Sequence, residues 1–98
     1  MLPRNEILNT LSRIKGLLSQ YGVSRIGLFG SAVRGEAGKN SDIDILIDFQ
    51  NDKETFQNFI STCELLEREL KGQKVDIVTF KGLSPDIGKH ILNEVVYV

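Results

Sequence analysis

The sequence predicts an α/β fold in which a small mixed β-sheet is flanked by helices, with those helices on one side of the sheet. Two observations support this prediction. Apolar residues recur at three- and four-residue steps in two long segments, and short apolar runs between the helical segments have the length and composition of strands. The predicted order is helix, strand, short helix, strand, helix, strand, helix. With 98 residues, 41% of them hydrophobic, we expect a single domain across residues 1–98 with one modest core.

The first helix is predicted from about Pro3 to Tyr21, because its apolar residues form one stripe and Gly22 provides a stop. A short buried strand then runs from Arg25 to Phe29. The stripe of the helix consists of Ile7, Leu8, Leu11, Ile14, Leu17, Leu18 and Tyr21.

The second half of the chain predicts a covering helix, a strand and a final helix. Thr55 to Lys71 has helical spacing, and Lys74 to Phe80 is an apolar run interrupted by one aspartate. The final helix starts at Ser84, with serine as the cap and proline at the first helical position, and ends near Asn93. The apolar tail Val95 to Val98 either adds a short strand or packs on another subunit.

The stretch from Ile26 to Phe49 reads as strand, turn and strand, and its second half alternates aspartate with isoleucine. Because successive side chains of a strand point to opposite faces, Asp42 and Asp44 share one face, roughly 6 to 7 Å apart. Two carboxylates at this range repel each other, so a divalent cation such as Mg²⁺, which prefers oxygen ligands, is expected between them. Asp48 has the same parity but lies about 13 Å along the strand, which assigns it to the surface.

Gly30-Ser31 predicts an anion site ahead of these aspartates. Glycine lets the backbone approach an anion, and serine donates its hydroxyl group. Arg34 lies on the same side of a helical turn as Ser31, where it either reaches that anion or forms a structural ion pair with Glu36 or Asp42. The polar loop from residue 36 to residue 41 is expected to be exposed, with Lys39 at its tip either solvated or in reach of a phosphate.

The segments Gly30-Ser31, Arg34-Gly35 and Ser41-Asp42-Ile43-Asp44 together resemble the Gly-Ser…Asp-x-Asp signature of the polymerase-beta-like nucleotidyltransferase superfamily. The resemblance is closest to its smallest members, the minimal nucleotidyltransferases, and covers essentially the whole chain. It implies the polymerase-beta-like nucleotidyltransferase fold. It also implies a third carboxylate from a later strand, a role that Asp76 fits.

The resemblance further implies transfer of AMP from ATP to a hydroxyl acceptor with release of pyrophosphate. Two Mg²⁺ ions would be held by Asp42, Asp44 and Asp76, which makes these three aspartates both the metal ligands and the catalytic residues. Gly30 and Ser31 would hold the β- and γ-phosphates, with Arg34 as a further nucleotide contact.

For the acceptor, the resemblance points to a HEPN-type toxin whose tyrosine is adenylylated, which would make the chain an antitoxin of a toxin-antitoxin system. Two alternatives stay open. The chain could be a non-catalytic antitoxin that binds and masks its partner, or a small-molecule nucleotidyltransferase of the aminoglycoside-modifying type. An intact set of three aspartates argues against the first alternative.

Composition narrows the expected partners and location. The net charge is −1, and no cluster of lysines or arginines exceeds two neighbours, so direct nucleic-acid binding is not expected. The single Cys63 and the lack of a leader or a long apolar span favour a reducing cytoplasm and no membrane association. An oligomer built through the apolar tail is also compatible with the sequence.

Overall fold

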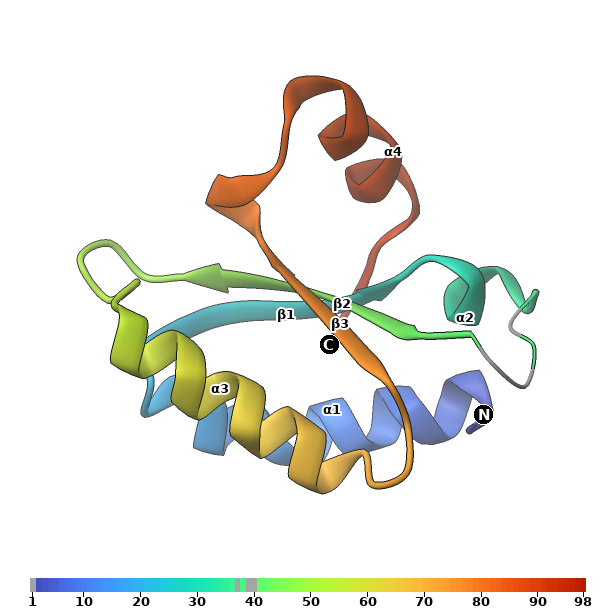
Figure 1. The fold of residues 1–98 in the computed structure, drawn as a ribbon, viewed down its shortest axis with the longest axis horizontal. Helices are drawn as coiled ribbons and strands as arrows, with labels where there is room; N and C mark the ends of the chain where they lie inside the picture. Colours follow the sequence, from blue (N-terminus) through green and yellow to red (C-terminus); the bar gives the residue numbers. More distant parts are fainter. Residues whose placement is uncertain (1, 37, 39–40) are drawn as a thin grey trace.

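A four-stranded mixed sheet forms the centre of the protein in the computed structural model, which describes residues 2–36, 38 and 41–98. Its strand order is β3-β2-β1-β4. Figure 1 shows the helices on either side of this sheet. The elements are α1 (Arg4–Ser19), β1 (Val23–Phe29), α2 (Ser31–Arg34), β2 (Ile43–Phe49), α3 (Phe56–Glu69), β3 (Val75–Thr79), the 3-10 turn η1 (Phe80–Gly82), α4 (Pro85–Glu94) and β4 (Val96–Tyr97).

The pairing of the strands makes the sheet mixed, as predicted. β1 runs antiparallel to both β2 and β4, whereas β2 and β3 are parallel and are joined through α3. A parallel pair needs such a crossover connection, which explains the long helix between the two strands. The apolar tail adds the short strand β4, so the first of the two alternatives for this segment is confirmed.

One face of the sheet is covered by α1 and α3, which lie below the strands in Figure 1. The main core forms here because β2 directs its isoleucines to this face, and the helices supply leucines at helical spacing. The buried members are Ile7, Leu11, Ile14, Leu18, Val23, Ile26, Leu28, Ala32, Ile43, Ile45, Ile47, Phe49, Leu65, Leu66 and Leu70.

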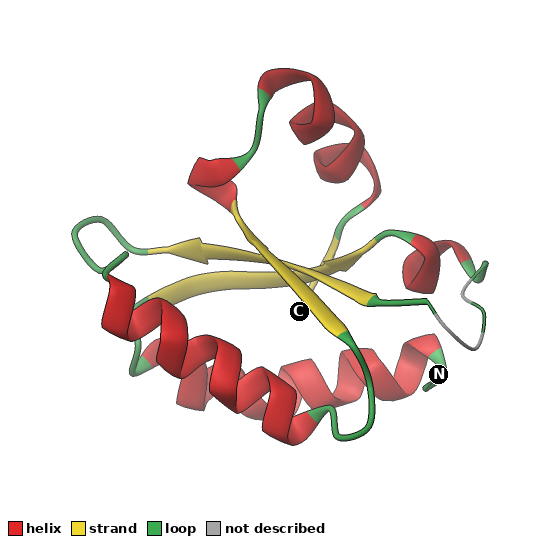
Figure 2. Ribbon diagram, in the orientation of Figure 1, coloured by secondary structure: helices red, strands yellow, loops and turns green. Residues whose placement is uncertain are grey.

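The other face of the sheet carries α4, so the prediction that the helices lie on one side is wrong. Phe29 of β1, Leu46 of β2 and Ile91 of α4 form a second, smaller buried cluster. Figure 2 shows α4 across the strands from α1 and α3. The physical reason is Leu46, which points away from the isoleucines of its own strand and needs a cover of its own.

Side-chain caps begin both α3 and α4, and the cap of α4 is the predicted Ser84. The Thr55 hydroxyl accepts a hydrogen bond from the Asn58 backbone N–H at 3.1 Å, and Ser84 caps α4 ahead of Pro85. Gly22 follows α1 with φ +84°, a backbone conformation that favours glycine.

Among the helices in residues 2–36, 38 and 41–98, none combines the length and apolar character needed to cross a membrane.

Candidate active site

Two of the predicted aspartates are direct neighbours across parallel strands. Asp44 of β2 lies opposite Asp76 of β3 in the register of the pair, and Asp42 immediately precedes β2. These residues share the parity of Leu46 and Val78, which contact the α4 side of the sheet. The strand register therefore places Asp42, Asp44 and Asp76 on the same face of the sheet.

Asp44 is the half-buried member of this group, whereas Asp42 and Asp76 are exposed. Burial, with smaller contributions from the charges of Asp76, Asp42 and Glu94, raises the pKa of the Asp44 carboxyl group, and Arg34 partly opposes that rise. The carboxyl group of Asp44 thus lies where both low polarity and neighbouring negative charge disfavour its ionisation. A cation at this position would relieve both costs.

Gly30 lies directly over Asp44. Phe29 pairs with Asp44 in the register of β1 and β2, so the turn that leaves β1 starts above this carboxylate. Gly30 adopts φ 78° and ψ −156°, and a Cβ atom placed on it would collide with Oδ2 of Asp44. Glycine is therefore required here for two reasons: its backbone conformation, and the close approach of the turn to the aspartate.

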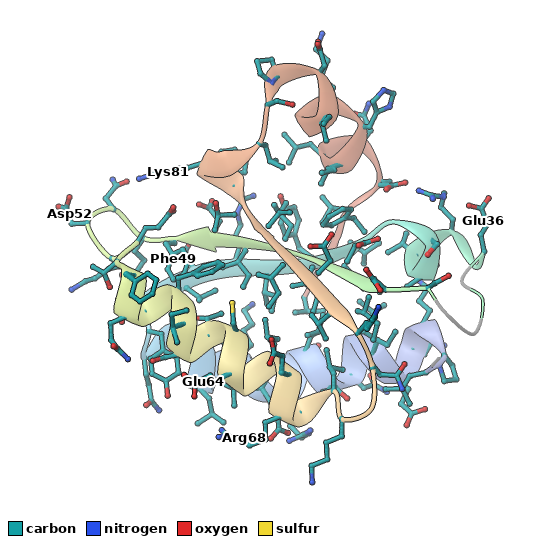
Figure 3. All side chains as sticks on the ribbon, viewed as in Figure 1. Glu36, Phe49, Asp52, Glu64, Arg68 and Lys81 are labelled. Atoms are coloured by element: carbon teal, nitrogen blue, oxygen red, sulfur yellow. The ribbon has the colours of Figure 1, made fainter. Side chains whose placement is uncertain are left out.

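Arg34, at the end of α2, is held by two carboxylates. Its Nη1 donates to Oε2 of Glu94 at 2.6 Å, and its Nε donates to Oε1 of Glu36 at 2.6 Å. The other oxygen of Glu94, Oε1, accepts the backbone N–H of Gly30 at 2.9 Å. Figure 3 shows Glu36 beside α2, at the opposite end of the sheet from Lys81 on η1.

The ion pair between Arg34 and Glu36, one of the alternatives for Arg34, is present, and Asp42 does not take the place of Glu36. Glu94 was not predicted as part of the site. The hydrogen bond from the Arg34 guanidinium lowers the pKa of the Glu94 carboxyl group, and the Gly30 N–H acts in the same direction. Nothing in the local sequence marks Glu94, because it is 64 positions away from Gly30 along the chain.

The other predicted residues are placed as follows. Ser31 is the first residue of α2 and is half-buried beside the turn. Asp48 is half-buried rather than free on the surface, and it forms an ion pair with Arg25 at 3.1 Å. Lys39 lies outside the described residues. Cys63 is half-buried on α3, where burial raises the pKa of its thiol.

The three aspartates have the donor chemistry of a magnesium site, since all of them supply carboxylate oxygens and their charges interact. Within the part of the chain that the structure describes, no three acidic, histidine or cysteine side chains are close enough together to form a metal-binding group. The residue types and their shared face fit the ion.

A separate hollow lies away from the aspartates, between α3, β3 and α4. It has a volume of about 460 Å³ and is lined mainly by apolar residues, and no predicted site residue contributes to it. The lining residues are Phe59, Ile77, Val78, Thr79, Gly82, Leu83, Ser84, Ile87 and Ile91.

Comparison with known proteins identifies the family of the chain. Residues 11–98 match the nucleotidyltransferase domain family. The chain belongs to this family. The protein adenylyltransferase MntA of Thermococcus cleftensis is 46% identical to this nucleotidyltransferase. The match covers 100% of this chain and 98% of MntA. A candidate protein adenylyltransferase of Methanocaldococcus jannaschii is 39% identical over 93% of the chain and 100% of the relative.

Solved structures share the fold of this nucleotidyltransferase. A candidate minimal nucleotidyltransferase superposes with a TM-score of 0.83 at 30% identity, covering 97% of this chain and 95% of that one. A toxin-antitoxin structure with AMP-PNP gives a TM-score of 0.66 at 24% identity, covering 98% and 72%, and this second likeness concerns the fold alone. The predicted fold class and the assignment as a nucleotidyltransferase are confirmed.

Proposed function

We propose that this nucleotidyltransferase transfers AMP from ATP to a hydroxyl group of a partner protein, a HEPN-type toxin, and so acts as its antitoxin. The observation that carries the proposal is Asp44, which lies directly beneath the Gly30 turn and is paired with Asp76 on the neighbouring strand. Support for a protein acceptor comes from the relative named protein adenylyltransferase, which matches along the full chain. Support for a toxin partner comes from the toxin-antitoxin structures that share the fold.

The residues of the site divide into a phosphate side and a metal side. Gly30 and Ser31 would hold the β- and γ-phosphates, with Arg34 neutralising part of their charge. Asp42, Asp44 and Asp76 would hold two Mg²⁺ ions. Bound there, the ions would supply charge neutralisation for the triphosphate and a lower pKa for the acceptor hydroxyl.

In the proposed reaction the oxygen of the acceptor hydroxyl forms a bond to the α-phosphorus of ATP. The bond from that phosphorus to the bridging oxygen breaks, and its electron pair leaves with pyrophosphate. The hydroxyl proton passes to the carboxylate of Asp76, which is exposed and therefore accessible to an incoming acceptor. Gly30, Ser31 and Arg34 orient the leaving group, which lowers the barrier by positioning and charge stabilisation.

The test is transfer of label from α-labelled ATP in the presence of Mg²⁺ to proteins of a host lysate. Wild type should label a partner band, whose mass increases by one or more AMP units, and EDTA should abolish the label. The double variant Asp42→Ala, Asp44→Ala should give no band while remaining folded by circular dichroism. Exposed Asp86 of α4 offers a matched control, because Asp86→Ala should label normally.

Two outcomes would contradict the proposal. Label in an aminoglycoside panel without any labelled protein would indicate a small-molecule transferase. Protection from a toxin by the double aspartate variant would indicate masking without catalysis.

We further propose that residues 1–98 act as one domain in the cytoplasm. We also propose that the tail from residue 95 to residue 98 supports an oligomer, and sedimentation analysis would test this oligomeric state.

A further inference from the structure

The carboxylate of Glu94 occupies the donors that face the proposed phosphate position. Each of its oxygens accepts a separate hydrogen bond, Oε1 from the Gly30 backbone N–H at 2.9 Å and Oε2 from Arg34 Nη1 at 2.6 Å. A backbone N–H and a guanidinium are also the groups that proteins commonly use to bind phosphate oxygens. Glu94 is therefore bound in the way that a phosphate group would be bound.

The surroundings of Glu94 are otherwise unfavourable for a negative charge. Its charge acts on Asp44, which is already close to Asp42 and Asp76. A fourth carboxylate beside this group adds repulsion, which is offset by the hydrogen bonds from Arg34 and Gly30 and by the attraction of Arg34 and His90. The position of Glu94 is therefore favourable only while no other anion binds the Gly30 N–H and Arg34 Nη1.

A triphosphate and the Glu94 carboxylate cannot both accept the same hydrogen atoms. We propose that Glu94 is a built-in competitor of the nucleotide, which takes the Gly30 and Arg34 donors in the free protein, leaves them when ATP binds and returns to them as pyrophosphate departs. The proposal rests on the proposed function, because it assumes that ATP binds at this turn. Removal of Glu94 should therefore strengthen ATP binding, whereas removal of a residue that positions Arg34 for the nucleotide would weaken it.

The place of Glu94 in the fold suits such an exchange. It is the last residue of α4, and the next segment pairs with β1 through Val96 and Tyr97. Glu94 is thus at the junction of a helix and a strand, where its side chain can leave its donors without a change in the pairing of the sheet. Its side chain is 25% exposed, which leaves solvent available to the carboxylate once it is released.

The experiment measures the binding of AMP-PNP, inorganic pyrophosphate and AMP by calorimetry with Mg²⁺ present, for wild type, Glu94→Gln and Glu94→Ala. Both variants should bind AMP-PNP and pyrophosphate about three- to ten-fold tighter than wild type, because a charged competitor has been removed. AMP lacks the β- and γ-phosphates, so its affinity should change less. Thermal unfolding of each variant shows whether α4 is still folded.

A matched control separates this effect from a general change of charge. Glu64 is exposed on α3, so Glu64→Gln removes one negative charge away from α2 and should leave all three affinities unchanged (Figure 3). Weaker or equal binding of AMP-PNP by both Glu94 variants, relative to Glu64→Gln, would overturn the proposal and leave the proposed function intact. Failure of wild type and every variant to bind AMP-PNP would overturn both.

Discussion

Substituting Gly30 by alanine should cost more stability than any other glycine-to-alanine change in the site. With φ 78° and ψ −156°, Gly30 lies in a region of backbone space that is essentially restricted to glycine. Holding another residue there costs about 1 to 3 kcal/mol. The new methyl group would also collide with the Asp44 carboxylate, so a value at the upper end, about 3 kcal/mol, is expected.

Two other glycines provide matched comparisons for this value. Gly35 has φ 72° and ψ 18°, with open space around its Cβ position, so Gly35→Ala should cost only the left-handed backbone term of about 1 to 2 kcal/mol. Gly16 lies inside α1 with nothing near its Cβ position, so Gly16→Ala should stabilise the protein by about 0.5 to 1 kcal/mol.

The assay is urea unfolding in metal-free buffer, with the free energy of unfolding extrapolated to water. A loss of about 3 kcal/mol from a domain whose stability is of the order of 5 to 15 kcal/mol leaves most of the Gly30→Ala protein folded, so its activity can be measured. Transfer of AMP should fall sharply, because Asp44 must move aside. If Gly30→Ala is no less stable than Gly35→Ala, the close approach to Asp44 is not a real constraint.

Three further predictions concern stability. Asp44→Asn should stabilise the metal-free protein at pH 7, because the raised pKa of Asp44 means that its ionised form destabilises the fold. Urea unfolding should show this gain in stability shrinking as the pH falls toward 4, because the wild-type carboxyl group becomes protonated. Thr55→Ala removes the cap that accepts the Asn58 N–H, so chemical unfolding should show a loss of about 1 kcal/mol. Leu46→Ala opens a cavity beneath α4 and should cost about 2 to 5 kcal/mol, with a lower melting temperature, and a loss below 1 kcal/mol would contradict the second core.

Local patterns predicted most of the elements because each has its own signal in the sequence. The apolar stripe of α1, the helical spacing of α3 and the Ser84-Pro85 start of α4 all act over a few residues. The alternation of aspartate and isoleucine along β2 also predicted which side chains share a face. The role of Asp76 as third carboxylate was implied by the resemblance, and its pairing with Asp44 was not predicted, since strand register is not local.

The second face of the sheet was misjudged for an identifiable reason. Along β2 the aspartates alternate with apolar residues, which resembles a strand with one face in solvent. Leu46 breaks that pattern, since it occupies an aspartate-side position and is fully buried. Its apolar side chain was the sequence signal that part of this face is covered. In the structure α4 covers it.

Glu94 could not be found from the sequence because only the tertiary fold brings it to Gly30. The pairing of β4 with β1 returns the end of α4 to the point where β1 finishes, and no spacing rule connects residues 30 and 94. Charge patterns along α4 do not distinguish Glu94 from any exposed acidic residue near a helix end.

The way α4 is attached also bears on which part of the protein opens first. Apart from Gly88, its buried residue is Ile91, and the short β4 pairs with β1 through Gly27 with Tyr97 and Leu28 with Val96, with one further hydrogen bond from the Val98 N–H to the Ile26 carbonyl. β1 and β2, by contrast, have neighbours on both sides and fully buried side chains. Amide protons of α4 should therefore exchange with solvent through a low-energy opening, long before those of β1 and β2. Each such opening would carry Glu94 away from Gly30.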